Sequence, residues 1–415
     1  MKVINGGICA AKGFKASGMY CGVKAAPVEG YDPTIQHKND ICLFVSDVPC
    51  EAAAVYTQNK VKGAPIIVTK RNLEKSGNKA IAVIANSKNA NTCNADGVEK
   101  ADAMCRLVAD ALSVPKEQVV VASTGVIGQV LPLEPIKKAV PELVTKLDYN
   151  KNLEAATAIM TTDTTPKEYA VEFEINGTTC HMGGMAKGSG MIHPNMATTL
   201  NFITTDCNIS AELLKEALSE IVKITYNCLS VDGDTSTNDM VSLMANGLSL
   251  NDEITCHGEA FDTFSDALYE VMANLTRMLA KDGEGATKLL ECIVSGARDK
   301  DTAIVVAKSV ICSDLFKTAM FGEDANWGRI LCAIGYAPAE FDISRVDVAL
   351  KSKYGEVKVC RNGSGIEFSE ELAAKVLSSD EIFILVNLND GEEDATAWGC
   401  DLTYDYVKIN GDYRT

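Results

Sequence analysis

A glycine-rich segment at residues 183–200 contains several residues of types that enzymes use for chemistry, among them Lys187, His193 and Thr198. A nucleotide-binding P-loop needs GxxxxGK followed by Ser or Thr, and here the lysine precedes its glycine, so the spacing does not fit. The GxSxG elbow of many serine hydrolases is absent, because Gly188-Ser189-Gly190 has a different spacing. A histidine in a loop, such as His193, is more often a hydrogen-bonding residue than a catalytic base. The segment therefore favours neither phosphate binding nor serine hydrolysis.

A threonine nucleophile that internal cleavage releases is the third possibility. The threonine hydroxyl is a weak nucleophile and needs a base to take its proton. When the threonine is the first residue of a chain, its own α-amino group, with a pKa of about 7.7–8.0, can be that base without a histidine. Spacing alone does not distinguish this role of Thr198 from that of an ordinary residue at the start of a strand.

The sequence lacks the ligand spacings of common metal sites. None of the 15 cysteines forms a CxxC pair, and the four histidines form no HExxH or HxH pattern. We therefore expect no metal and no cofactor. We expect the cysteines to be unpaired thiols in a reducing cytoplasm.

Length and charge limit the class of protein further. A chain of 415 residues exceeds the about 100–200 residues of one domain, so two or three structural units are expected. Asp and Glu number 56 against 39 Lys and Arg, which gives a net charge of −17 and disfavours binding to nucleic-acid phosphates. The chain has neither a run of about 18 apolar residues nor a secretory signal, so we expect a cytoplasmic protein without a membrane partner.

Strand-like and helix-like stretches alternate along the chain. Short apolar or β-branched runs predict strands, and apolar residues at helical spacing predict helices. The Asn176-Gly177 pair predicts a hairpin. We place a boundary near Gly285 without a flexible linker, so the two parts should pack tightly. The predicted strands are 80–85, 118–122, 168–175, 199–205, 289–294, 346–350, 357–360, 382–386 and 397–407, and the predicted helices are 98–112, 153–160, 211–226, 261–280, 302–315 and 370–377.

Several long motifs occur in the order that is typical of one enzyme family. The segment 187–200 resembles the cleavage and active-site segment of the ornithine acetyltransferase family of arginine biosynthesis. The resemblance covers the whole chain, and several motifs in the right order are more specific than any single one. The other matching motifs are 123–128, 160–164, 230–239, 282–287, 322–329 and 406–415.

The resemblance implies an acyltransferase that cuts its own precursor between Ala197 and Thr198, giving mature chains 1–197 and 198–415. Thr198 would then take the acetyl group of N-acetylornithine and pass it to glutamate, giving ornithine and N-acetylglutamate. Some family members also use acetyl-CoA as donor, and no motif decides this point. The family further implies a heterotetramer with two copies of each chain.

The resemblance also assigns site residues. Thr124 and Gly125 match the pair that forms the oxyanion hole. The positions matching substrate-binding residues are Thr161, Lys187, Thr198, Glu284, Asn410 and Thr415, although a one-residue shift would replace Thr161 by Thr162. Lys88 stands where the family usually has glycine, and we expect it to be a backbone variation away from the transferred group.

The family's fold implies an α/β class (an α+β sandwich) with stacked mixed sheets flanked by helices. Residues 1–285 would form the large sandwich domain with the cleavage site, and residues 286–415 a smaller C-terminal α/β domain. Two alternatives stay open. A self-processing aminopeptidase or amidase would use the same nucleophile with water as acceptor, and a binding protein with this fold would remain uncleaved.

Overall fold

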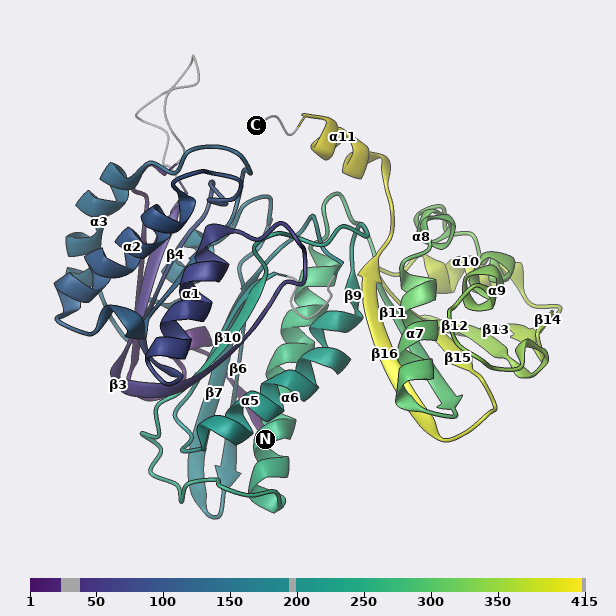
Figure 1. The fold of residues 1–415 in the computed structure, drawn as a ribbon. Helices are drawn as coiled ribbons and strands as arrows, with labels where there is room; N and C mark the ends of the chain where they lie inside the picture. Colours follow the sequence, from purple (N-terminus) through teal and green to yellow (C-terminus); the bar gives the residue numbers. More distant parts are fainter. Residues whose placement is uncertain (24–37, 194–198, 413–415) are drawn as a thin grey trace.

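The computed structural model describes residues 1–23, 38–193 and 199–412. Two mixed sheets flanked by helices form this part of the chain, which confirms the predicted fold class (Figure 1). Ala197, Thr198 and Thr415 lie outside the described residues.

The first sheet has nine strands and comes from the N-terminal two thirds of the chain. Its central strands β8 and β10 are buried along their whole length and run parallel to each other. In order across the sheet the strands are β1 (Lys2–Ile4), β6 (Lys167–Ile175), β7 (Thr178–Lys187), β8 (Leu200–Thr205), β10 (Met240–Ala245), β3 (Ile41–Tyr56), β4 (Lys79–Asn86) and β5 (Val119–Ser123), and β2 (Phe14–Met19) pairs with β3.

Successive side chains of β3 point to opposite faces, as the pleat of a strand requires. Leu43 packs into a cluster with helices α1 (Ala64–Lys75), α2 (Gly97–Leu112) and α3 (Leu133–Thr145). Phe44 packs into a separate cluster on the other face, which includes residues of α4 (Asn152–Ala158). Both faces of this half of the sheet are therefore buried.

The second sheet has seven strands, and most of them come from the last third of the chain. Their order is β14 (Ser364–Gly365), β13 (Gly355–Arg361), β12 (Asp347–Ser352), β15 (Glu381–Asn387), β11 (Leu289–Ala297), β16 (Glu393–Cys400) and β9 (Leu229–Ser230). The helices of this region are α7 (Lys300–Ile311), α8 (Asp314–Phe321), α9 (Trp327–Gly335) and α10 (Glu370–Leu377). The short strand β9 precedes residue 285 and pairs with β16, so the second sheet takes one strand from the earlier part of the chain.

The two sheets share one hydrophobic core. Helices α5 (Ala211–Ile224) and α6 (Glu259–Lys281) lie between them (Figure 1), and α6 contacts strands of both. A single buried cluster runs from Ile203 of β8 through Leu275 of α6 to Leu290 of β11. Residues before and after position 285 therefore pack against one another. Short 3-10 helices occupy Gly7–Cys9, Lys116–Gln118, Tyr226–Cys228 and Ile343–Arg345.

The predicted helix 370–377 coincides with α10, and the hairpin at Asn176-Gly177 joins β6 to β7. The single helix predicted at 302–315 is wrong, because the Ser313 side chain accepts the Phe316 N–H and begins a second helix, α8. None of the described helices combines the length and the apolar character that crossing a membrane requires.

The strand predicted at 397–407 is wrong beyond Cys400. The Asp401 carboxylate accepts the backbone N–H groups of Thr287 (2.8 Å) and Lys288 (2.9 Å), which holds the chain at the end of β16. The Thr403 hydroxyl then accepts the Asp405 N–H, and the helix α11 (Tyr404–Asp412) follows. In Figure 1 this helix lies near the top of the view, next to the label of the C-terminus.

Candidate active site

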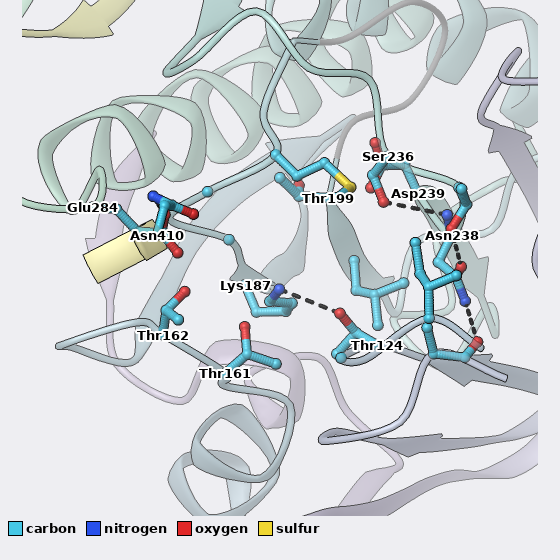
Figure 2. A pocket seen from close by; sticks show the side chains of 18 residues that line it. Thr124, Thr161, Thr162, Lys187, Thr199, Ser236, Asn238, Asp239, Glu284 and Asn410 are labelled. Atoms are coloured by element: carbon cyan, nitrogen blue, oxygen red, sulfur yellow. Dashed lines mark hydrogen bonds between the residues drawn. The ribbon is translucent and has the colours of Figure 1, made fainter. Parts of the chain in front are cut away.

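The ends of several strands surround a cavity of about 170 Å³. This volume is below the roughly 300–1,000 Å³ of sites for drug-sized ligands, and it suits a small metabolite. Six predicted site residues line the cavity together (Figure 2): Thr124, Gly125, Thr161, Lys187, Glu284 and Asn410.

The register of β8 brings the walls of the cavity together. Leu200 pairs with Lys187 of β7 on one side and with Met240 of β10 on the other. Thr199, the first described residue after the gap, is buried and lines the cavity. The predicted nucleophile Thr198, although outside the described residues, thus directly precedes a residue of the cavity wall in sequence.

Thr124 and Gly125 follow β5 and present two hydrogen-bond donors. The Thr124 hydroxyl accepts a hydrogen bond from Lys187 Nζ at 3.3 Å, which leaves its proton free to be donated. The Gly125 N–H has no acceptor among the described residues. A side chain at Gly125, whose φ is 129°, would place Cβ 2.3 Å from the carbonyl carbon of Lys88. Only glycine therefore fits this backbone.

The backbone of Lys88, which we expected to be a backbone variation away from the transferred group, packs directly against Gly125. Its φ is 74°, a left-handed conformation that glycine adopts more readily than lysine. The Lys88 carbonyl accepts the Val126 N–H at 3.3 Å, and Lys88 Nζ donates to the carbonyl of Met160 at 3.3 Å. These contacts hold the lysine in a conformation that is costly for its type.

Glu284 and Asn410 lie on the other side of the cavity from Thr124 (Figure 2). Asn410 of α11 donates Nδ2–H to Glu284 Oε2 at 2.7 Å, and the Glu284 N–H donates to the carbonyl of Ser189 at 2.8 Å. A Cβ at Gly190 would lie 2.4 Å from the Glu284 carboxyl carbon, so this glycine makes room for the carboxylate. The cavity therefore has a cation, Lys187, and an anion, Glu284, on its walls.

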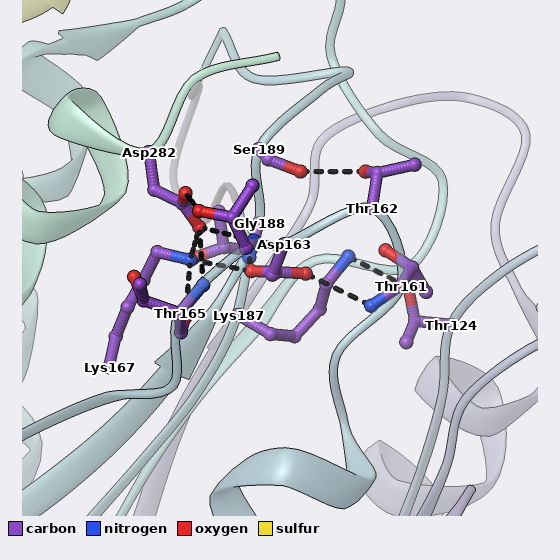
Figure 3. A network of polar contacts seen from close by, with 12 residues as sticks. Thr124, Thr161, Thr162, Asp163, Thr165, Lys167, Lys187, Gly188, Ser189 and Asp282 are labelled. Carbon is purple, nitrogen blue, oxygen red and sulfur yellow. Dashed lines mark hydrogen bonds and ion pairs between the residues drawn. The ribbon is translucent and has the colours of Figure 1, made fainter. Parts of the chain in front are cut away.

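Asp163 connects the Thr161 segment to the Lys187 segment (Figure 3). Its Oδ2 accepts the Thr161 N–H at 3.0 Å, and its Oδ1 accepts the Gly188 N–H at 2.7 Å and the Lys167 ammonium at 2.7 Å. Burial acts to raise the pKa of Asp163, but the charges of Lys187 and Lys167 and these hydrogen bonds outweigh it and hold the pKa well below its usual range.

Thr161 and Thr162 both line the cavity, so the choice between them stays open. The Thr162 hydroxyl lies 2.6 Å from the Ser189 hydroxyl and is already hydrogen-bonded. The Thr161 backbone N–H is held by Asp163. Figure 2 shows both threonines below Lys187 in the view.

One wall of the cavity, residues 236–239 before β10, was not predicted as part of the site. Asn238 Nδ2 donates to the carbonyls of Ala90 (2.6 Å) and Ser123 (2.9 Å), which ties this wall to the Thr124 turn. Asp239 is buried, its Oδ2 has no partner in the described part of the chain, and burial raises its pKa well above the usual range. The available signal was a run of four polar residues directly before a mostly apolar strand, inside a motif already matched.

His193 and the cysteines are the other reactive groups that the sequence singles out. His193 Nδ1 lies 3.1 Å from the Ser230 hydroxyl and His193 does not line the cavity, in line with a hydrogen-bonding role. All 15 cysteines are free thiols. In the described ranges, no group of three or more His, Cys, Asp or Glu side chains is arranged to hold a metal ion.

Comparison with known proteins identifies the family. The model of the ArgJ family matches residues 15–415. The chain belongs to the ArgJ family. Its relatives include the arginine biosynthesis bifunctional protein ArgJ of Caldanaerobacter subterraneus subsp. tengcongensis (48% identical over 416 residues, 100% of both chains) and that of Streptococcus thermophilus CNRZ 1066 (46%, 100% of both). This ArgJ-family chain is thus an acetyltransferase of arginine biosynthesis.

Two solved structures resemble part of the chain. The arginine biosynthesis bifunctional protein ArgJ of Bacillus halodurans is 46% identical and covers 51% of this chain and 98% of its own, with a TM-score of 0.48. The ornithine acetyltransferase of Mycobacterium tuberculosis, solved in complex with ornithine, is 36% identical and covers 47% of this chain and 99% of its own, with a TM-score of 0.41.

The lowered pKa of Asp163 predicts a pH-dependent effect of Asp163→Asn on stability. At pH 7 we expect the variant to lose about 3–5 kcal/mol of unfolding free energy, because Lys167 loses a buried partner. A carboxyl group with a lowered folded-state pKa stabilises fully above its unfolded-state pKa of about 3.9, and this stabilisation is lost as pH falls toward the folded-state pKa. The difference in unfolding free energy between wild type and variant should therefore become smaller below about pH 4.

Urea unfolding at pH 7, 5, 4 and 3 measures this difference. The exposed Glu220, paired with Lys223, gives the control Glu220→Gln, which should change the stability little at any of these values. A difference between Asp163→Asn and wild type that stays constant from pH 7 to pH 3 would contradict the assignment of a buried, ionised Asp163.

Proposed function

We propose that this enzyme transfers the acetyl group of N-acetylornithine to glutamate, after cutting itself between Ala197 and Thr198. The observation that carries the proposal is the gathering of six family site residues around one small cavity, beside the residue that follows Thr198. The names of the relatives support it, since they are arginine biosynthesis proteins and one was solved as an ornithine acetyltransferase with ornithine.

Maturation would use the Thr198 hydroxyl as an intramolecular nucleophile. Its Oγ attacks the carbonyl carbon of Ala197, the peptide C–N bond breaks, and the Thr198 amine takes up the proton. Water then hydrolyses the resulting ester, which returns the hydroxyl and leaves a carboxylate on Ala197. The product is a free α-amino group on Thr198, the base that an N-terminal threonine needs.

Acetyl transfer would repeat the same attack on the substrate. Thr198 Oγ adds to the acetyl carbonyl carbon of N-acetylornithine while the α-amine accepts the hydroxyl proton. The acetyl C–N bond breaks, the proton passes to the leaving nitrogen, and ornithine departs from an acetyl-Thr198 ester. The amine of glutamate then attacks this ester, N-acetylglutamate leaves, and Thr198 recovers its proton.

Each tetrahedral intermediate carries a negative oxygen, for which Thr124 and Gly125 are the proposed donors. The Thr124 hydroxyl has a proton to donate, because its oxygen already accepts from Lys187. The Gly125 N–H is without an acceptor in the described part of the chain. Donors that are already in place, close to a buried cation, stabilise developing charge without reorganising.

The charges on the cavity walls suit the two amino acids. We assign Lys187 to the substrate carboxylates and Glu284 to the ammonium end of ornithine, since each is opposite in charge to the group that it meets. Asn410, hydrogen-bonded to Glu284, would hold that carboxylate in place. Thr161, Thr198 and Thr415 complete the proposed substrate contacts.

Further parts of the proposal follow from the family. We propose a heterotetramer of two chains 1–197 and two chains 198–415, with domains 1–285 and 286–415, in the cytoplasm, where free thiols such as these persist. The word bifunctional in the names of the relatives supports a second donor, for which we propose acetyl-CoA. The cavity of about 170 Å³ would admit only the acetylated end of that donor.

The variant Thr198→Ala should remain one chain of 44.3 kDa without transferase activity, because it lacks the hydroxyl that serves both steps. Wild type should give fragments of about 21 and 23 kDa by intact mass spectrometry, the larger one beginning at Thr198. Thr145→Ala, the same change on the surface helix α3, should be cut and active like wild type.

Cleavage of Thr198→Ala at the wild-type rate would contradict the assignment of Thr198 as the nucleophile. Assays with and without glutamate separate the remaining alternatives. Consumption of N-acetylornithine that does not depend on glutamate would identify an amidase, and an intact, inactive wild-type chain would identify a binding protein.

The oxyanion-hole assignment predicts that Thr124→Val lowers kcat by about 10²–10³-fold, since one donor is removed while the shape is kept. Thr124→Ser keeps the hydroxyl and should retain most of the activity. Steady-state kinetics of both cleaved variants provides the measurement. A Thr124→Val enzyme with the kcat of wild type would contradict the assignment of Thr124 to the oxyanion hole.

A further inference from the structure

A buried ion cluster, shown in Figure 3, is hydrogen-bonded to residues that line the cavity. Its centre is the Lys167 ammonium, whose side chain is 1% exposed, and which lies 2.7 Å from Asp163 Oδ1 and 2.6 Å from Asp282 Oδ2. Both carboxylates are also shielded from solvent, with side chains 0% and 9% exposed. Charges so deeply buried are stable only while each keeps its partner.

The cluster joins three of the chain segments that carry proposed substrate-binding residues, those of Thr161, Lys187 and Glu284. Asp163 follows Thr161 and bonds to the Gly188 N–H, next to Lys187. Asp282 accepts the Thr164 N–H at 3.0 Å and stands two positions before Glu284. Lys167 bridges the two carboxylates, so one buried cation ties all three segments together.

Two lysines act on the single carboxylate of Asp163, but only one of them pairs with it. Figure 3 shows the Asp163 carboxylate between Lys167 and Lys187. Lys167 forms the ion pair, whereas Lys187 forms none with any carboxylate of the described residues and instead donates to Thr124 Oγ1. The charges of both lysines lower the pKa of Asp163, so Lys187 lies close enough to be attracted to it.

We propose that Lys167 is a positioning residue: by pairing with Asp163 it keeps Lys187 directed at the cavity and Thr124. Without Lys167, Asp163 would be a buried and uncompensated anion, and Lys187 would move onto it because unlike charges attract strongly where water is excluded. The cavity would then lose its cation. The inference rests on the proposed function in one respect, the role of Lys187 in binding substrate carboxylates.

The proposal predicts an unusual pattern in a double-variant experiment. Lys167→Met should weaken ornithine binding, measured by calorimetry, and raise the KM for glutamate, both by about 10–100-fold, the effect of losing one charged hydrogen bond. Lys167→Arg, which keeps the charge, should restore most of the binding. Adding Asp163→Asn to Lys167→Met removes the anion that attracts Lys187, so the double variant should bind ornithine within about threefold of Asp163→Asn alone.

A cluster that only stabilises the fold predicts the opposite, because each further loss of a buried partner would add damage. A double variant that binds ornithine as poorly as Lys167→Met, or that does not fold by circular dichroism, overturns the proposal. Comparing ornithine binding by the double variant and by Asp163→Asn tests the role of Lys167 even if Lys167→Met alone does not fold.

The control is Lys223→Met, the same change at an exposed ion pair on α5, which should leave binding and kinetics unchanged. The activity of the wild type tests the proposed function independently of the proposed role of Lys167. A wild type that binds ornithine but transfers no acetyl group contradicts the proposed function, whereas the recovery in the double variant tests the role of Lys167 by binding alone.

Discussion

The pairing of β8 with its two neighbours is the constraint on which the site depends. All six residues of β8 are buried, and hydrogen bonds to β7 and β10 fix its register on both sides. This register places Lys187 and Met240 on either side of Leu200, so the ends of three strands meet at one cavity. A chain cut between Ala197 and Thr198 would have its new terminus one residue before Thr199, which is buried and lines the cavity.

The charges around the cavity depend on the same framework. The chain is strongly acidic, with a net charge of −17, yet the cavity wall holds a lysine that pairs with no carboxylate in the described part of the chain. A second, deeper lysine offsets the nearby Asp163. Because a buried charge is costly unless it is compensated, Asp163 needs another cation if Lys187 is to remain directed at the cavity. Lys167 is that cation, and its cluster links the cavity to α6 through Asp282.

Local patterns in the sequence predicted elements where local physics decides the structure. The Asn176-Gly177 hairpin follows from the left-handed conformation that this turn requires, and the helix 370–377 follows from its spacing of apolar residues. The segment after Cys400 was wrongly predicted as strand, because the turn there depends on Asp401 bonding to backbone groups more than 100 residues away in sequence. No local pattern contains that contact.

The residues of the site also fall into two groups, those predicted from the sequence and those recognised only in the structure. The resemblance to a family named six residues that the fold brings to one cavity, although they come from five separate parts of the chain. It did not reveal Asp239, Asn238 or the Lys167 cluster, whose importance lies in burial and in contacts across the fold. In the sequence, Asp163 and Lys167 are ordinary charged residues, and only the surrounding structure makes their pairing necessary.

The most direct test of the account is mass spectrometry of the enzyme quenched during incubation with N-acetylornithine in the absence of glutamate. The account predicts that the fragment 198–415 gains about 42 Da, that the acetyl group maps to the side chain of Thr198, and that added glutamate removes it. A fragment that gains no mass while substrate is consumed, or an acetyl group on another residue that glutamate does not discharge, would contradict transfer through Thr198.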